Sequence, residues 1–467
     1  MLTRLEVSGF KNLRDVRIDL GAFTCIAGEN GVGKSNVFDA IEFLSSLTNL
    51  SFGEAAQQLR GDNGSRVGDV RDIFWRDMDS TSAEISLAAE MLVPEYVEDD
   101  LGAQARASTT FLRYEVRLGY EAPSDAVSNG RITLRHESLT HITKGEARRH
   151  LKFPHAAKEF RAAVVKGERR GGPFLSTIHR EGTLVVNVHG DGGSFGRPQP
   201  RGAERSSRTI LSTMTTNDNP TALAARREMQ SWRRLSLEPS AMRAPDNFSA
   251  PQQMGSDGSH IASTLWRIAH SELPGGDVDS EAVYARVADR LSDLLGSRVA
   301  RVYVDRDLVR EVFTLYVDEG GGKVFPARAL SEGTLRFLAL CVLLEDPTMR
   351  GLVCMEEPEN GIHPANLTAM MQLVQDLALD AFKAPGDTNP FRQVIVNTHS
   401  PGVVQISGPE NLVYARIPGG SSGLQLYGYE GSWRALAGMP TFSTLDALPY
   451  LTPPKGVQLE LPLEYSA

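Results

Sequence analysis

The sequence has few cysteines and no paired ones. Its 467 residues include only three cysteines, Cys25, Cys341 and Cys354, and no C-x-x-C pair. This scarcity excludes the disulfide framework of small secreted domains and a cysteine-rich zinc site. Cys25 and Cys354 fall within apolar, strand-like segments, so we expect buried free thiols in a reducing compartment.

Two further absences concern membranes and nucleic acids. No run of about 18 apolar residues occurs, and the segment from Met1 to Arg4 lacks the apolar core of a signal peptide. We therefore expect a cytoplasmic protein with no membrane partner. The net charge of −9 argues against a surface built entirely for nucleic acid, although it leaves room for a local basic face. At about 150 residues per domain, the length predicts roughly three structural units.

A phosphate-binding pattern stands near the N-terminus. Residues 28–35 read GENGVGKS, which fits G-x-x-x-x-G-K-S. The apolar segment 23–27 predicts a buried strand before the loop, and 35–44 predicts a helix after it. A strand followed by this loop and a helix is the context that a P-loop requires.

Each residue type in this loop has a chemical reason. Glycines let successive backbone N–H groups turn toward an anion at a helix N-terminus, so Asn30, Gly31 and Gly33 are expected to cradle phosphates. Lys34 would reach the β- and γ-phosphates, and the Ser35 hydroxyl would take a place on Mg²⁺. The predicted ligands are therefore ATP and Mg²⁺.

The surrounding sequence carries a family resemblance. Residues 4–20 alternate at period two and predict a hairpin that leads to the P-loop strand. The run L-x-V-x-G-F-K-N-L followed by F-x-C-I-A-G-E-N-G-V-G-K-S-N-V-F-D-A-I resembles the opening of ABC-type, SMC-related AAA family ATPases. The branch is the one with RecF, the chromosome-maintenance ATPases and the OLD-family proteins, and Asn36 directly after Ser35 is typical of it.

The resemblance implies an α/β fold of the P-loop NTPase class. It predicts an ABC-type ATPase head with a mostly parallel core sheet, an antiparallel β subdomain and a short irregular or helical lid insertion. The alternating segments 83–91, 111–120 and 131–139 are expected to form the antiparallel sheet. In such heads a glutamine beyond the P-loop helix contacts Mg²⁺, but Gln57 and Gln58 lie in no distinctive motif, and an ordinary surface helix is favoured for both.

The stretch 140–236 is different in character. Its periodicity is weak, glycine and proline clusters interrupt it, and we predict an irregular lid. From Arg161 to Arg234 thirteen basic residues stand against six acidic ones. Such an insertion suggests a surface for a phosphate backbone or an acidic partner, although an ordinary solvated insertion is the favoured alternative. No long heptad run occurs, so the coiled-coil arm of the chromosome-maintenance group is missing.

Two motifs in the second half complete the predicted chemistry. Residues 330–334 read LSEGT and resemble the L-S-G-G-Q signature, so Ser331 and the amides around Gly333 are expected to bind the γ-phosphate of nucleotide held by the other protomer. The apolar strand 351–355 runs into Glu356 and Glu357, which is the pattern of a Walker B motif. Glu356 would serve Mg²⁺, and Glu357 would polarise the attacking water.

Two histidines follow these carboxylates. The segment 359–364 resembles the D-loop, which crosses the dimer interface. Asn360 and His363 are expected to be structural or interface residues, and no partner spacing supports His363 as a metal ligand. His399 follows the buried strand 393–398 and matches the switch histidine, which contacts the γ-phosphate. Its place after the other motifs favours a catalytic role over that of a satisfied core histidine.

We divide the chain into four predicted parts. These are the first part of the head with the P-loop (1–139), the basic lid (140–236), the second part of the head with the signature, Walker B, D-loop and switch histidine (237–420), and a tail (421–467). The segments 412–416 and 424–427 are expected to be closing strands. The nuclease domain that OLD-family nucleases carry beyond this point has no counterpart, so no nuclease activity is expected from this chain.

The resemblance implies a homodimer, or a larger even-numbered oligomer, that closes around MgATP. Heads of this type resemble the ATPase subunits of prokaryotic anti-phage systems such as Septu and PARIS. We therefore hypothesise a scaffold that regulates a separate nuclease or toxin effector. Two alternatives stay open: a RecF-like DNA-repair ATPase that binds DNA through the basic insertion, and a sensor that binds nucleotide without turning it over.

Overall fold

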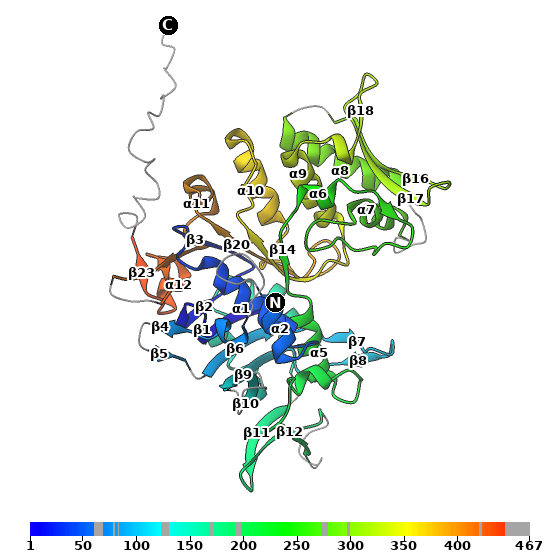
Figure 1. Ribbon diagram of the computed structural model, residues 1–467. Helices are drawn as coiled ribbons and strands as arrows, with labels where there is room; N and C mark the ends of the chain where they lie inside the picture. Colours follow the sequence, from blue (N-terminus) through cyan, green and yellow to red (C-terminus); the bar gives the residue numbers. More distant parts are fainter. Residues whose placement is uncertain are drawn as a thin grey trace.

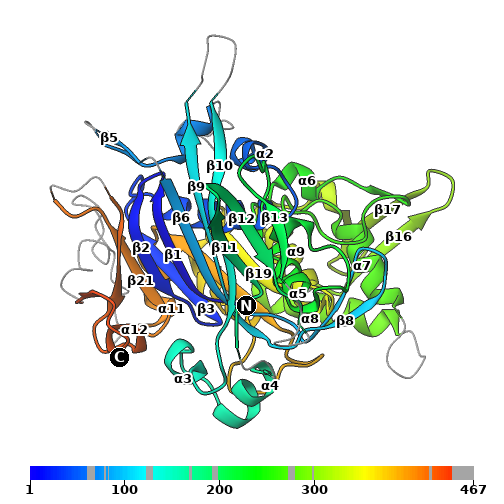
Figure 2. The ribbon, with the colours of Figure 1, turned by 90° about the horizontal axis from the view of Figure 1, so that it is seen from below.

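Two large β-sheets organise the molecule (Figures 1 and 2). The computed structural model describes residues 1–59, 69–77, 80–82, 84–122, 130–167, 171–191, 198–271, 279–296, 299–419 and 423–443. The core sheet has the order β14 (Arg233–Leu235), β19 (Gly351–Glu356), β20 (Arg392–Thr398), β3 (Phe23–Gly28), β21 (Leu412–Arg416), β22 (Gln425–Tyr429) and β23 (Thr441–Phe442). The first five strands run parallel, and β22 is antiparallel to β21.

The second sheet is antiparallel throughout. Its order is β13 (Gln199–Gly202), β12 (Thr183–Val188), β11 (Leu175–Arg180), β10 (Arg131–His141), β9 (Phe111–Glu121), β6 (Glu84–Leu92), β1 (Leu2–Phe10) and β2 (Leu13–Asp19). An apolar core joins the two sheets, with side chains from β1, β6 and β9 on one side and Leu352 and Ile395 of the core sheet on the other. The P-loop helix α1 (Lys34–Ser46) contributes Val37, Phe38 and Ile41 to the same core.

A helical part covers the other face of the core sheet (Figure 1, upper half of the view). Its helices are α6 (Pro239–Met242), α7 (Ile261–His270), α8 (Ser280–Leu295), α9 (Glu332–Glu345), α10 (Leu367–Asp376) and α11 (Pro401–Ser407), beside a small sheet of β15 (Asp246–Asn247), β16 (Arg301–Asp307), β17 (Val312–Asp318) and β18 (Val324–Pro326). The apolar helix α9 buries Leu335, Phe337 and Leu338, which explains why its sequence is apolar all round rather than on one stripe.

The predicted fold class is confirmed: an α/β P-loop head with a mostly parallel core sheet and a separate antiparallel sheet. The strands predicted at 23–27, 111–120, 351–355 and 393–398 all form. Buried parallel strands read as continuous apolar runs, which is why the pattern located them well. The segments 412–416 and 424–427 form β21 and β22 as expected.

The lid predicted as irregular or helical also contains strands. Strands β11, β12 and β13 extend the antiparallel sheet, α5 (Pro220–Gln230) packs in the apolar core, and β14 joins the core sheet. The sequence analysis missed β11 and β13 because β13 is exposed on both faces and half of the residues of β11 are exposed, so neither strand shows a period-two pattern. Domain boundaries stay a prediction, although the pairing of β10 with β11 crosses the one placed at 139.

The remaining described elements are short. They are α2 (Phe52–Gln58), α3 (Ala147–His150), α4 (Ala162–Val164), α12 (Trp433–Leu436), β4 (Arg76–Asp77), β5 (Ser80–Thr81), β7 (Tyr96–Glu98) and β8 (Gln104–Arg106). All three cysteines are buried and free, and burial raises the pKa of the Cys25 and Cys341 thiols to about 12. Among the helices of the described ranges, none is long and apolar enough to cross a membrane. The predicted tail beyond residue 443 lies outside these ranges.

Candidate nucleotide site

The P-loop joins β3 to α1 in a conformation that suits glycine. Gly31 and Gly33 have φ angles of 81° and 98°, the left-handed region that side chains disfavour. A Cβ atom at Gly33 would lie 2.0 Å from the amide nitrogen of Asn12, whereas one at Gly31 would meet nothing within 4 Å. Gly33 is therefore required by both conformation and space, and Gly31 leaves an open cradle beside the loop.

Asn12 supports this loop from the hairpin between β1 and β2. Its Nδ2 donates to the Val32 carbonyl at 2.8 Å, and its Oδ1 accepts from Asn36 Nδ2 at 2.8 Å. Asn36 thus holds the loop through Asn12 while also lining the pocket. The neighbouring residue of the hairpin, Lys11, binds Asp39 of α1 at 2.6 Å.

The Lys34 ammonium lies inside the loop. Its Nζ donates to the carbonyl oxygens of Gly28 at 2.7 Å and Glu29 at 2.9 Å. Burial lowers the pKa of Lys34, and the nearby carboxylates of Glu357 and Glu356 act in the opposite direction. An ammonium held this way is placed to exchange carbonyl oxygens for phosphate oxygens, which bind it more strongly.

The two predicted metal ligands are brought together at the ends of neighbouring strands. Asn397 at the end of β20 pairs in register with Glu356 at the end of β19. Its Nδ2 lies 3.4 Å from Ser35 Oγ and 3.5 Å from Glu356 Oε1, so one amide group stands between the hydroxyl and the carboxylate. Hydroxyl and carboxylate oxygens are the donors that Mg²⁺ prefers, and the residues present fit the predicted ion.

Glu357 adopts a conformation that is uncommon for a glutamate. Its φ is 43°. Its N–H donates to two oxygens of Asn397, the backbone carbonyl oxygen at 3.0 Å and the side-chain Oδ1 at 3.1 Å. Its Oε1 lies 2.7 Å from His399 Nδ1, and its Oε2 accepts from Asn360 Nδ2 at 2.8 Å. These hydrogen bonds hold the backbone of Glu357 in its left-handed conformation, and both oxygens of its carboxylate have a partner.

The predicted signature residues lie elsewhere. Ser331 caps α9, where its side chain accepts from the Thr334 N–H at 3.2 Å, and it is exposed. Neither Ser331 nor Gly333 is among the described residues that line the P-loop pocket. Arg336, one turn into the same helix, does line that pocket, and its Nη1 donates to the Asn360 carbonyl at 2.7 Å.

These groups surround a polar cleft of about 610 Å³, a size that suits a nucleotide. Its lining residues are Lys11, Asn30, Gly31, Gly33, Lys34, Ser35, Asn36, Asp39, Ser236, Leu237, Glu238, Arg336, Glu356, Glu357, Asn360 and Asn397. The open cradle at Gly31, the inward Lys34 ammonium and the oxygen donors at the strand ends together fit MgATP.

Several of these residues escaped the sequence analysis. Asn12, Arg336 and Asn397 lie in segments that were identified, but no chemical role was given to them. Arg234 was counted with the basic insertion, yet its Nη2 lies 2.6 Å from Glu356 Oε1. The one available signal was position: Asn397 precedes His399 by two residues at the end of a strand that was already expected to reach the site.

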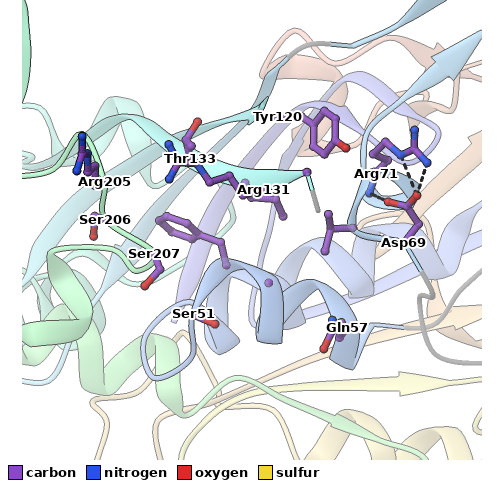
Figure 3. A pocket seen from close by; sticks show the side chains of 15 residues that line it. Ser51, Gln57, Asp69, Arg71, Tyr120, Arg131, Thr133, Arg205, Ser206 and Ser207 are labelled. Carbon is purple, nitrogen blue, oxygen red and sulfur yellow. Dashed lines mark hydrogen bonds and ion pairs between the residues drawn. The ribbon is translucent and has the colours of Figure 1, made fainter. Parts of the chain in front are cut away.

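The glutamines considered for Mg²⁺ lie away from the cleft. Gln57 and Gln58 are exposed on α2, and Gln57 lines a separate hollow of about 650 Å³ under the β9–β10 hairpin (Figure 3). Arg71 at the edge of that hollow is paired with Asp69 (Figure 3).

His363 is exposed and structural. Its Nδ1 accepts from the Ala365 N–H at 3.2 Å. The described part of the chain holds no cluster of three histidine, cysteine or acidic side chains that could bind a metal ion.

Two family profiles match parts of the chain. Residues 228–405 match a family described as "AAA domain, putative AbiEii toxin, Type IV TA system". Residues 1–145 match a family described as "AAA ATPase domain". The first range holds the signature, Walker B and His399, and the second holds the P-loop.

Curated relatives match a shorter segment. The DNA replication and repair protein RecF of Bacteroides fragilis (strain YCH46) is 33% identical over 86 residues, which cover 18% of this chain and 22% of that protein. The DNA replication and repair protein RecF of Myxococcus xanthus (strain DK1622) is 40% identical over 68 residues, 14% of this chain and 18% of that protein. The chain therefore matches about a fifth of the length of these relatives.

Solved structures with similar chains are SMC heads. The SmcHead bound to the C-winged helix domain of ScpA is 13% identical with a TM-score of 0.47, covering 91% of this chain and 97% of that one. The SMC head domain from Thermotoga maritima is 12% identical with a TM-score of 0.37, covering 92% and 99%. The two AAA matches cover different parts of the chain, and each contains residues of the cleft: the P-loop in the first 145 residues and the Walker B carboxylates in 228–405.

Proposed function

We propose that this ATPase closes as a homodimer around two MgATP molecules, with each site completed by the signature residues of the second copy. The observation that carries the proposal is the division of the motifs. Lys34, Ser35, Glu356 and Glu357 line one cleft, whereas Ser331 is exposed outside it. A second copy that presents its Ser331 and the first amides of α9 would bring an anion-binding helix end to the γ-phosphate.

The chain's own groups divide the work of hydrolysis. The loop amides and Lys34 bind the phosphates, and Ser35 and Glu356 would hold Mg²⁺, which supplies charge neutralisation when bound. Glu357 would accept the proton of an attacking water, and the contacts of its carboxylate with Asn360 and His399 support this role.

The mass of the purified protein tests the dimer. Light scattering with ATP and Mg²⁺ should give a dimer, or a larger even-numbered assembly, that is absent without nucleotide and absent in Lys34→Ala. An assembly of the same mass under all conditions would contradict the composite site, because association would then be independent of the cleft.

The cellular role we propose is control of a separate nuclease or toxin effector in prokaryotic anti-phage defence. The match of residues 228–405 to a family described with a toxin and a toxin–antitoxin system supports a role of this class. Co-expression with the product of an adjacent gene should yield a complex whose formation depends on the ATP-closed state. A dimer that binds no second protein in either nucleotide state would count against this role.

A DNA-repair function of RecF type is the second candidate, favoured by the relatives matched over 86 and 68 residues. It predicts ATP hydrolysis stimulated by DNA and an affinity that falls steeply with salt. The described arginines of the basic stretch weaken this candidate, because several are engaged within the protein. Arg226 and Arg227 pair with Asp100, and Arg234 pairs with Glu356.

A further inference from the structure

Arg234 links the Walker B strand to the P-loop helix. On β14, at the edge of the core sheet, its Nη2 lies 2.6 Å from Glu356 Oε1. Its Nη1 lies 2.7 Å from Asp39 Oδ1 and 3.3 Å from Glu42 Oε2, both on α1. The guanidinium therefore bridges the carboxylate predicted for Mg²⁺ and the helix that begins at Lys34.

The centre of this bridge is shielded from solvent, whereas Glu42 at its edge is partly exposed. The side chain of Arg234 is 11% exposed and that of Asp39 is 3% exposed. Asp39 also accepts Lys11 Nζ, so the cluster contains two cations and the three carboxylates of Asp39, Glu42 and Glu356. Because a buried charge without a partner is costly, Arg234 determines where the Glu356 carboxylate can rest.

We propose that Arg234 is a positioning residue that sets the affinity of the nucleotide site for Mg²⁺ by fixing the Glu356 carboxylate. This inference rests on the proposed function, since it takes the cleft to hold MgATP. The fold supports it from a second direction: Asn397 Nδ2 approaches the same Oε1 of Glu356 at 3.5 Å and also faces Ser35. Arg234 and Asn397 thus both approach Oε1 of Glu356, and Asn397 also approaches the hydroxyl of Ser35, the other predicted metal ligand.

The sign of the effect follows from the neighbouring charges. A cation beside a metal site would weaken Mg²⁺ binding if its charge were unopposed, but the charge of Arg234 is offset by Asp39 and Glu42. Without Arg234, Glu356 would gain rotamer freedom and could turn to the Lys34 ammonium, on whose pKa it already acts. Partners that orient metal ligands typically change metal affinity by on the order of 10-fold or more when removed.

The neighbouring arginine provides a matched control. Arg233 is adjacent on the same strand, so its side chain leaves the opposite face of the sheet. Its Nη2 donates to Gln253 Oε1 at 3.3 Å, remote from the carboxylate cluster. Arg233→Gln removes the same charge from the same strand without touching Glu356.

The experiment measures binding of a fluorescent ATP analogue by anisotropy, first in EDTA and then as Mg²⁺ is added. Arg234→Gln should leave the affinity in EDTA within about 2-fold of wild type and raise the Mg²⁺ concentration at half-maximal enhancement on the order of 10-fold. Arg233→Gln should match wild type in both measurements. An unchanged or lowered Mg²⁺ midpoint in Arg234→Gln would overturn the inference.

Two further outcomes would have other meanings: a wild type that does not respond to Mg²⁺, and a variant that does not fold. If wild type shows no Mg²⁺-dependent binding, the proposed function fails before the variants are compared. If circular dichroism shows that Arg234→Gln is unfolded, Arg234→Lys decides: it keeps the charge, but a single ammonium cannot span both Asp39 and Glu356. A raised midpoint in Arg234→Lys supports the inference, and a wild-type midpoint contradicts it.

Discussion

The predicted site residues at the P-loop end of the core sheet and at the start of helix α9 differ in their exposure to solvent. At the first, Lys34, Glu356 and Asn397 are buried or half-buried; Asn397 bonds to Glu356 across neighbouring strands, and Lys34 donates to carbonyl oxygens of its own loop. At the second, Ser331 is exposed and bonded within its own helix turn. The predicted phosphate and metal ligands therefore lie together within a single chain, whereas the predicted signature serine faces solvent.

The difference teaches where a second copy would matter. Binding of nucleotide should depend on the cleft alone, whereas closure and turnover should need both regions. Arg336 and Asn360 lie between them, since Arg336 belongs to α9 and Asn360 holds the Glu357 carboxylate. In the proposed closure, a movement of α9 would therefore reach Glu357, the predicted general base, through Arg336 and Asn360.

The largest effect is expected from Lys34→Ala, which should weaken ATP binding on the order of 100-fold, because charge-assisted bonds to phosphate are lost. ATP-dependent association should vanish with it. Isothermal titration and light scattering measure the two effects. Lys383→Ala is the control, because Lys383 is 74% exposed and paired only locally with Asp380. Retained association in Lys34→Ala would break the proposed dependence on the cleft.

Glu357→Gln should reduce hydrolysis by at least about 100-fold while ATP still binds and the dimer accumulates. The amide keeps the shape of the side chain but cannot take a proton from water. Phosphate release and light scattering provide the readouts. A wild-type rate that is itself near zero and is unchanged in the variant would instead favour a nucleotide sensor without turnover.

Changes at Ser331 should separate the two regions. Ser331→Asp preserves the helix cap but places a negative charge toward the γ-phosphate of the partner, so binding to one chain should stay within about 2-fold while closure and hydrolysis are lost. Ser331→Asn, which caps equally well without the charge, is the matched variant and should lose less.

A mixture of Ser331→Asp with Lys34→Ala should recover hydrolysis. A mixed dimer contains one intact pairing of Lys34 with Ser331, although each variant alone contains none. A mixture that stays inactive, while light scattering shows that mixed dimers form, would contradict a site shared between copies.

The smallest effect on nucleotide binding is expected far from the cleft, at Glu137 in β10, where the change should be in stability instead. Burial raises the pKa of this carboxyl from 4.5 to about 7, and its oxygens accept from the Ile210 and Leu211 N–H groups. A raised pKa means that the folded state holds the proton more tightly, so this contribution is complete below pH 4.5 and is lost as pH rises through about 7.

The corresponding variant is Glu137→Gln. As pH rises, its free energy of unfolding should fall less than that of wild type, by up to about 3 kcal/mol. Urea unfolding between pH 5 and pH 8 measures the decline, and ATP affinity should not change. Parallel pH profiles for wild type and variant would contradict the assignment.

Local sequence patterns predicted the parts of the site that form within one segment. The P-loop, the paired carboxylates after β19 and the histidine after β20 each follow an apolar strand, so their place at one sheet edge could be inferred. The lid could not be inferred in the same way. The strand β13 has no buried face and therefore no alternating apolar pattern. It is recognised as a strand through its pairing with β12.

The sequence by itself determined the fold class and the positions of Lys34, Ser35, Glu356, Glu357 and His399, because strand burial and loop glycines leave a local signature. Only the tertiary structure decided what orients them. Helices α6 to α9 and the small sheet lie between Arg234 and Glu356 in the sequence, and the place of Arg234 among basic residues pointed to the surface. Strand pairing between β14 and β19 brings the two together, and a contact of that kind depends on topology, which no single segment encodes.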